Sequence, residues 1–219
     1  MPQMIHTTQA LLDKYPIISD QIKRPALEVV ISELERVLLT NPPVQGSIVE
    51  FGCYVGTTSL FMRRLLDTFG ESEALRELHV YDSFEGLPSK APQDMTPVGA
   101  DFKAGELSVN RKQLIAEFNK AHLRLPRIHK GWFNQLTDRE VPNRIAFAFL
   151  DGDFYDSIID SLRLVWPHMS PGGTICIDDY KRDALPGVEW AVRDFFQHKD
   201  VSVGVAHNIG IIRCQTHPR

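Results

Sequence analysis

Cysteine, excess positive charge and long apolar runs are all scarce in this chain of 219 residues. Its three cysteines, Cys53, Cys176 and Cys214, are odd in number and far apart, which argues against a disulfide framework and favours a reducing compartment. The formal net charge of −4 gives no general attraction to nucleic acid or anionic membranes, because both bind basic surfaces. No window approaches the roughly 18 apolar residues of a membrane span, and the first residues lack the basic and apolar regions of a signal peptide. We therefore expect a cytoplasmic protein that binds a small molecule, and neither nucleic acid nor membrane.

What is present is the composition of an ordinary globular protein. The chain is 43% hydrophobic and 24% charged, so one well-filled core is expected. The one break in composition falls near residues 41–46, where Asn41, Pro42 and Pro43 follow a helical pattern. We interpret residues 1–45 as an N-terminal helical extension and residues 46–219 as the main domain.

Hydrophobic patterns alternate between strand and helix along this main domain. Apolar residues at helical spacing predict helices over 24–40, 59–69, 107–123, 156–166 and 188–196. Short apolar runs predict strands over 47–53, 78–82, 127–131, 145–151 and 173–179, and a closing hairpin over 201–215 with its turn at 208–210. Such alternation is typical of βαβ units, so we predict an α/β fold with a mainly parallel sheet, helices on both faces and an antiparallel edge.

Acidic residues end four of the predicted strands: Glu50, Asp82, Asp151 and the pair Asp178 and Asp179. Ligands of open parallel sheets bind outside the carboxyl ends of the strands, so these acids mark the expected binding edge. An aspartate after a strand is also a common turn former or helix cap, and we expect Asp156 or Ser157 to cap the helix that follows. Two adjacent like charges at the end of a buried strand repel unless a cation or hydrogen-bond donors offset them. A bound metal or ligand is therefore favoured at Asp178 and Asp179.

A glycine-containing turn, Glu50-Phe51-Gly52-Cys53-Tyr54-Val55-Gly56, lies between the first strand of the main domain and a helix. It lacks both the G-x-G-x-x-G spacing of dinucleotide sites and the G-K-[ST] of phosphate loops. Asp82, at the end of the next strand, is placed to accept hydrogen bonds from ribose hydroxyls. A ribose-bearing cofactor that is not held through phosphates fits this pattern, and S-adenosylmethionine is such a molecule.

Several longer segments resemble one known family. They are 48-IVEFGCYVGTTS-59, 80-VYDSFEGLP-88, 128-IHKGWFNQL-136, 147-FAFLDGDFYDS-157, 171-PGGTICIDDYKRDALPGVEWAVRDF-195 and the terminal GIIR, in order across about 170 residues. Together they resemble the macrocin O-methyltransferase (TylF/MycF) family of class I S-adenosylmethionine-dependent methyltransferases, which acts in natural-product tailoring. The resemblance implies a Rossmann-like sheet of seven strands with an antiparallel last strand, and an enzyme that uses S-adenosylmethionine and a divalent cation, usually Mg²⁺.

The resemblance also implies roles for individual residues. Those expected to bind the cofactor are Glu50, Gly52 and Gly56 at its methionine end, Asp82 and Ser83 at the ribose, Gly131 and Trp132 at the adenine, and also Tyr54, Asp151 and Asp153. Those expected to hold the cation are Asp151, Asp178 and Asp179, whose hard carboxylate oxygens suit Mg²⁺. Asp151 is in addition the candidate catalytic base.

The acceptor is left open by the sequence. A sugar hydroxyl of a natural product is the first choice and a catechol-like phenol the second, with an amine or a carboxylate as further alternatives. The alternatives from other classes are a non-catalytic S-adenosylmethionine-binding protein on the same fold and a nucleotide-sugar oxidoreductase. We also expect a homodimer, a solvated Lys181, and a lid over the substrate formed by residues 83–105 with the N-terminal extension.

Overall fold

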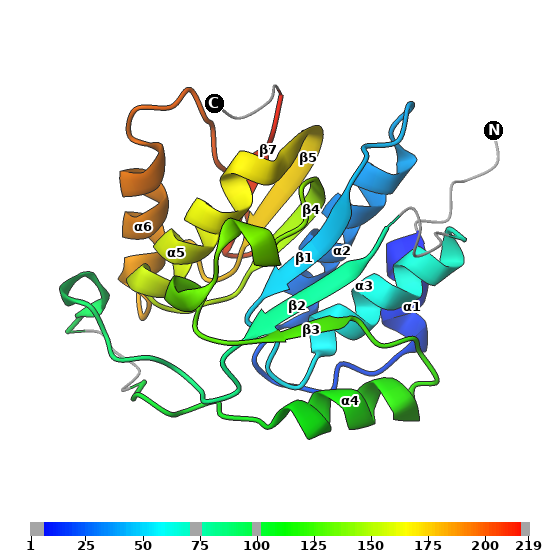
Figure 1. Cartoon of the computed structure of the whole chain (residues 1–219), viewed down its shortest axis with the longest axis horizontal. Helices are drawn as coiled ribbons and strands as arrows, with labels where there is room; N and C mark the ends of the chain where they lie inside the picture. The colour runs from blue at the N-terminus through cyan, green and yellow to red at the C-terminus, as the bar shows by residue number, and fades with distance from the viewer. Residues whose placement is uncertain (1–6, 71–75, 98–101, 216–219) are drawn as a thin grey trace.

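A seven-stranded sheet runs through the described residues, 7–70, 76–97 and 102–215, of this computed structural model in the order β3-β2-β1-β4-β5-β7-β6 (Figure 1). Strand β7 is antiparallel to both of its neighbours, and the other neighbouring pairs are parallel. The predicted mainly parallel sheet with an antiparallel strand near one edge is therefore confirmed. The strands are β1 (Ser47–Phe51), β2 (Leu78–Asp82), β3 (Arg127–Lys130), β4 (Ile145–Leu150), β5 (Met169–Ile177), β6 (Gly204–Ala206) and β7 (Ile209–Arg213).

Strand β4 occupies the centre of the sheet, between β1 and β5. Each of its six residues is buried, as expected for a parallel strand that is covered on both faces. From β1 the chain adds β2 and β3 toward one edge of the sheet, and it then adds β4 and β5 toward the other edge. The order therefore reverses between β1 and β4. This switch point opens a crevice at the carboxyl ends of the two strands, which is where open α/β sheets bind ligands.

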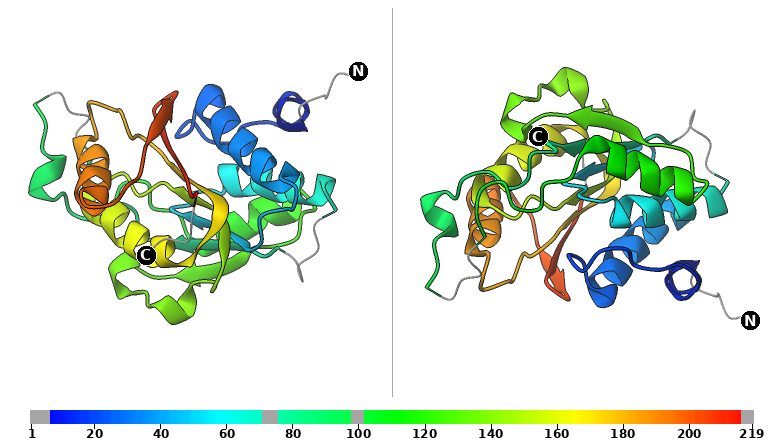
Figure 2. Two further views of the ribbon diagram at one scale, coloured as in Figure 1. Left: turned by 90° about the horizontal axis from the view of Figure 1, so that it is seen from above. Right: turned by 90° about the horizontal axis from the view of Figure 1, so that it is seen from below.

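Helices cover both faces of the sheet (Figure 2). They are α1 (Thr7–Lys14), α2 (Arg24–Leu39), α3 (Thr57–Thr68) and α4 (Arg111–Lys120) on one side, and α5 (Tyr155–Val165) and α6 (Pro186–Phe196) on the other. Short 3-10 turns span Pro92–Asp94, Phe133–Gln135, Asp138–Glu140 and Trp166–His168. The described residues contain no helix with the length and apolar character that crossing a membrane requires.

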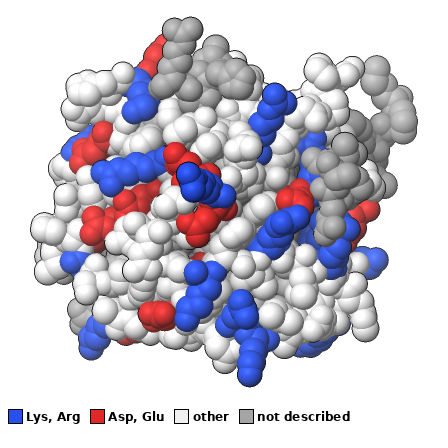
Figure 3. Space-filling model, in the orientation of Figure 1, with Lys and Arg blue, Asp and Glu red and all other residues white. Residues whose placement is uncertain are grey.

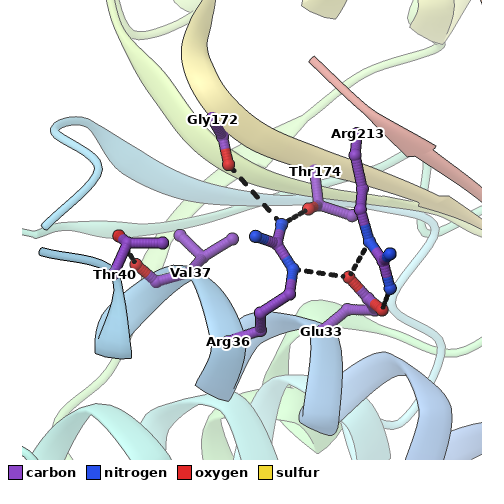
Figure 4. A network of polar contacts seen from close by, with 7 residues as sticks. All are labelled: Glu33, Arg36, Val37, Thr40, Gly172, Thr174 and Arg213. Carbon is purple, nitrogen blue, oxygen red and sulfur yellow. Dashed lines mark hydrogen bonds and ion pairs between the residues drawn. The ribbon is translucent and has the colours of Figure 1, made fainter. Parts of the chain in front are cut away.

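Helix α2 forms a core with the sheet, although it belongs to the N-terminal extension. Its apolar stripe is fully buried and packs in one cluster with side chains of β1 and β4. A polar contact adds to this packing: the carboxylate of Glu33 accepts hydrogen bonds from Arg36 (Nε, 3.0 Å) on its own helix and from Arg213 (Nε, 3.1 Å) on β7 (Figure 4). The guanidinium of Arg36 also donates to Thr174 on β5. These contacts attach the N-terminal extension to β5 and β7.

A pair of histidines joins β2 to the edge strand β3. The Nδ1 atom of His79 lies 3.1 Å from Nε2 of His129, and Nε2 of His79 lies 3.2 Å from the carboxylate of Glu77. Since the carboxylate can only accept a hydrogen bond, neutral His79 carries its proton on Nε2, and His129 donates to the bare Nδ1. Burial, then the neighbouring His129, lowers the pKa of His79 to about 4. His79 is therefore neutral in the folded protein at neutral pH.

The closing hairpin has a two-residue turn at His207 and Asn208, both with positive φ (49° and 67°). Positive φ at both central positions suits the right-handed twist of the flanking strands. The predicted turn at 208–210 therefore begins one residue too late and ends two residues too late. All three cysteines are buried and free, which confirms that no disulfide links them. On the face shown in Figure 3, acidic and basic side chains lie interspersed, so this face offers no continuous basic surface.

Candidate functional site

A cleft lies at the carboxyl ends of the central strands and encloses about 1050 Å³, including the part open to solvent. This is the place expected for a small-molecule site in an α/β sheet. Its walls come from the segments that follow β1, β2, β3, β4 and β5, together with the first turns of α5 and Gln21 before α2. The acidic residues at the ends of β2, β4 and β5 thus meet around one cavity.

The glycine-containing turn after β1 forms the floor of this cleft. Gly52 has a φ of 86°, and a Cβ atom there would overlap the carbonyl oxygen of Asp151 at the end of β4. Gly56, with a φ of 91°, is the N-cap of α3, and a Cβ there would overlap the side chain of Leu114 on α4. Both glycines are therefore required by backbone conformation and close packing.

Asp82 holds two loops of the cleft together. Its Oδ2 atom accepts hydrogen bonds from the backbone N–H groups of Cys53 (2.9 Å) and Tyr54 (3.2 Å), and its Oδ1 atom accepts one from Phe84 (2.7 Å). The carboxylate still has acceptor capacity, because two oxygens offer about four lone-pair sites. Asp82 therefore fixes the turn after β1 and also lines the cleft, where a ligand hydroxyl can reach it.

Four aspartates gather where β4 and β5 end: Asp151, Asp153, Asp178 and Asp179, all of which line the cleft. Burial, then Asp178, raises the pKa of Asp151 well above its usual value. Burial, then Asp179, raises the pKa values of Asp153 and Asp178 to about 7. Such a cluster is stabilised by any cation that approaches it, because the cation offsets the mutual repulsion.

The donor set has the chemistry that a hard divalent cation prefers, since carboxylate oxygens are the ligands of Mg²⁺ in proteins. Its present arrangement is not a finished metal site: among the described residues, no three His, Cys, Asp or Glu side chains converge as ligands. Two of the three expected ligands are engaged elsewhere. Asp178 Oδ1 accepts a hydrogen bond from the backbone N–H of Asp179 (2.9 Å), and Asp179 Oδ2 pairs with Arg182 Nη1 (2.8 Å).

Most of the site residues expected from the sequence line this cleft: Gly52, Tyr54, Asp82, Ser83, Trp132, Asp151, Asp153, Asp178 and Asp179. Glu50, Gly56 and Gly131 do not. Glu50 is buried on β1 and accepts a hydrogen bond from Ser59 on α3, and burial, followed by Asp82, raises its pKa to about 8. Gly131 donates its N–H to the carbonyl oxygen of Asp82 (3.0 Å). These three residues lie outside the cleft lining and shape the loops that form it.

The first turn of α5 is capped differently from the sequence expectation. The prediction that Asp156 or Ser157 caps this helix is wrong, because the N-cap position is Phe154 and its side chain makes no capping bond. The N–H of Tyr155 instead donates to Asp94 (2.8 Å), which lies 61 positions earlier in the chain. Asp156 and Ser157 line the cleft.

Asp94 also anchors the segment that we expected to form a lid. Its other carboxylate oxygen accepts the N–H of Ala91 (2.8 Å), and the side chain is buried against Gly187 at the start of α6. At the base of the segment, Leu87 pairs with Gly105 and Glu106 through backbone hydrogen bonds. Residues 98–101 of the expected lid lie outside the described residues.

Several residues of the cleft were missed by sequence reasoning: Gln21, Leu87, Leu107, Phe133, Asn134, Asp160 and Arg182. Leu87, Phe133, Asn134 and Arg182 lie inside the segments that carry the family resemblance, where no role was assigned to them, and Gln21, Leu107 and Asp160 lie outside those segments. The expectation of a solvated Lys181 is confirmed, because its side chain is exposed and pairs with Glu189. The basic residue that lines the cleft is its neighbour, Arg182.

Comparison with solved structures places the fold among known methyltransferases. The O-methyltransferase NovP matches with a TM-score of 0.71 at 24% identity, over 86% of this chain and 79% of that one. The calicheamicin methyltransferase CalS11 also matches with a TM-score of 0.71, at 20% identity, over 97% of this chain and 93% of that one. At these identities the likeness shows the fold, which is that of the Rossmann-like class I methyltransferases.

Curated relatives at higher identity are named for O-methylation. The 8-demethyl-8-(2,3-dimethoxy-alpha-L-rhamnosyl)-tetracenomycin-C 4'-O-methyltransferase of Streptomyces olivaceus is 36% identical over 69% of this chain and 58% of its own length. The mycinamicin III 3''-O-methyltransferase of Micromonospora griseorubida is 28% identical over 73% of this chain and 63% of its own length. The chain thus spans about three fifths of the length of these relatives.

The model of one protein family matches most of the chain, over residues 22–210. The match begins just before α2 and ends within β7, so it takes in every element that forms the cleft. The chain belongs to the macrocin O-methyltransferase (TylF) family.

Proposed function

We propose that this protein is an S-adenosylmethionine-dependent O-methyltransferase whose acceptor is a sugar hydroxyl of a glycosylated natural product. The observation that carries the proposal is the position of Asp82, at the end of β2, with its carboxylate on the turn after β1 and on the wall of the cleft. The acceptor class comes from the relatives: the S. olivaceus enzyme is named for the 4' position of a rhamnosyl-tetracenomycin, and the M. griseorubida enzyme for the 3'' position of mycinamicin III.

Cofactor binding is assigned to the side of the cleft formed after β1, β2 and β3. Asp82 would accept hydrogen bonds from the ribose hydroxyls, and Ser83 would donate one to the ribose. The side chain of Trp132 would lie against the adenine. Gly52 leaves its backbone bare beside Asp151, which lets the methionine end approach the floor of the cleft. Glu50 and Gly56 contribute through the shape of this turn, because neither lines the cleft.

Acceptor activation is assigned to the carboxylates after β4 and β5. Bound S-adenosylmethionine supplies an electrophilic methyl group, and a divalent cation held by Asp151, Asp178 and Asp179 supplies positive charge that makes a nearby hydroxyl more acidic. Asp151, which lines the cleft, would take the proton of the acceptor hydroxyl. Asp153 would orient the amino group of the cofactor from the same cluster.

Methyl transfer to a small panel of acceptors tests the proposal. The panel contains glycosylated natural products with free sugar hydroxyls, their aglycones and a simple catechol, each incubated with S-adenosylmethionine and Mg²⁺ or with a chelator. Methylation of the glycosides at a sugar position, lost with the chelator, is expected. Methylation of the catechol alone would favour the phenol alternative, and cofactor binding with no transfer to any acceptor would favour a non-catalytic binding protein.

A further inference from the structure

The cleft has a strongly unequal charge. Among the described residues that line it, seven are aspartates and a single one, Arg182, is basic. The aspartates are Asp82, Asp151, Asp153, Asp156, Asp160, Asp178 and Asp179. The positive charge of Arg182 therefore opposes the binding of a further cation in the cleft.

Arg182 is bound to one of the three carboxylates that we assign to a divalent cation. Its Nη1 atom lies 2.8 Å from Oδ2 of Asp179, and its backbone N–H donates to the carbonyl oxygen of Asp179 (3.2 Å). Asp179 itself has a φ of 53° and is fixed through its neighbour, since Tyr180 donates its N–H to Asn208 (2.8 Å) and packs against Gly210. The backbone of this turn is therefore held by contacts that do not involve the ion pair.

The two partners differ in exposure. The carboxylate side chain of Asp179 is 15% exposed and that of Arg182 is 41% exposed. An ion pair with one partner in contact with solvent is weak, because water and salt screen it. The aromatic face of Phe102 lies 5.7 Å from the guanidinium and offers a second resting place for the same cation.

We propose that Arg182 is an internal counter-ion of the cleft, which occupies Asp179 in the metal-free protein and gives it up to a divalent cation by moving toward Phe102. This inference rests on the proposed function, because it requires the cation site formed by Asp151, Asp178 and Asp179.

A purely structural role for Arg182 makes the opposite prediction. If the residue only held the turn from Asp179 to Arg182, its loss would loosen a ligand and weaken cation binding or leave it unchanged. If it competes for Asp179, its loss removes the competitor and strengthens cation binding. The sign of the change separates the two roles.

The test is the affinity of the full chain for Mn²⁺, used as a probe for a hard divalent cation and followed through the spectroscopic signal of free Mn²⁺, without acceptor. Arg182→Gln should bind Mn²⁺ about two- to fivefold more tightly than the wild type, the range expected when a partly exposed ion pair no longer competes. Lys181→Gln is the matched control: it removes the same charge from the adjacent position, where the side chain pairs with Glu189 and lies outside the cleft lining.

A double variant makes the assignment to Asp179 specific. In an Asp179→Asn background, Arg182→Gln should give no further gain, because the residue for which the two cations compete is gone. Unchanged or weaker Mn²⁺ binding by Arg182→Gln would overturn the inference, and so would an equal gain in Lys181→Gln, which would be an effect of net charge.

Failure of the wider proposal gives a different result. S-adenosylhomocysteine binding is measured on the same samples. If the wild type and every variant bind S-adenosylhomocysteine but no Mn²⁺, the metal site and this inference both fail while the cofactor site stands. If S-adenosylhomocysteine does not bind either, the proposed function fails as well.

Discussion

Replacing Asp82 by alanine should weaken both the fold and cofactor binding, because its carboxylate holds the loops after β1 and β2 and is also the one that we propose for the ribose. Three backbone N–H groups lose their acceptor, those of Cys53, Tyr54 and Phe84. Hydrogen bonds to a charged group contribute about 1.5–3 kcal/mol each, but these amides border a cleft and recover part of this from water. We therefore expect the free energy of unfolding to fall by about 2–4 kcal/mol.

The affinity for S-adenosylmethionine should fall in the same variant by about 1–3 kcal/mol, or roughly 5- to 150-fold. Part of this loss comes from the ribose hydroxyls and part from the relaxed turn after β1. Asp82→Asn should give an intermediate result, because the amide retains one acceptor oxygen and presents donors on the other side. Urea unfolding of the free protein and calorimetric titration of the cofactor measure the two effects separately.

Glu85→Gln is the matched control, since Glu85 is exposed and its carboxylate pairs with Lys130 away from the cleft lining. It should change both quantities by less than about 1 kcal/mol. Unchanged stability of Asp82→Ala would refute the role of the three hydrogen bonds. Unchanged cofactor affinity would remove Asp82 from the ribose site.

Three further predictions concern other parts of the molecule. Gly52→Ala should abolish measurable cofactor binding and lower stability, because the new Cβ would overlap the backbone of Asp151; calorimetry that showed near-normal affinity would contradict this. Glu33→Gln should lower the free energy of unfolding by about 1–3 kcal/mol and leave cofactor affinity unchanged, since its two arginine partners lose a shared charge far from the cleft; denaturant unfolding measures the loss. Because burial beside His129 lowers the pKa of His79 from 6.5 to about 4, the unfolded chain binds the extra proton first as the pH falls. This group contributes its full share above pH 6.5 and should lose up to about 2 kcal/mol by pH 5; His79→Gln should show a correspondingly flatter unfolding profile, and an equal slope would refute the assignment.

The parts of the fold that follow from local patterns could be predicted from the sequence. The unbroken apolar run of β4 predicted a central strand, and the stripe of α2 predicted a helix over 24–40, which the structure shows as Arg24–Leu39. The acids at the strand ends could be placed at one edge because parallel strands share their direction. Their convergence on a single cleft follows from that shared direction.

Features that depend on partners distant in the chain could not be predicted in this way. The acceptor for the first N–H of α5 is Asp94, and no local pattern connects residues 94 and 155. The carboxylate of Glu50 is turned to Ser59 on α3, a choice set by packing on one face of β1. The path of the turn after β5 decides whether the side chain of Lys181 or that of Arg182 reaches the cleft. This turn begins at Asp179, which has a left-handed backbone conformation.

The central claim, that the cleft is an S-adenosylmethionine site, is tested most directly by calorimetric titration of S-adenosylhomocysteine into the wild-type protein, with Mg²⁺ and then with a chelator. We predict one site per chain with micromolar affinity in both conditions, because the residues proposed for the ribose and adenine follow β2 and β3, whereas the clustered aspartates follow β4 and β5. No binding in either condition would contradict it and leave the acidic cleft without its proposed cofactor.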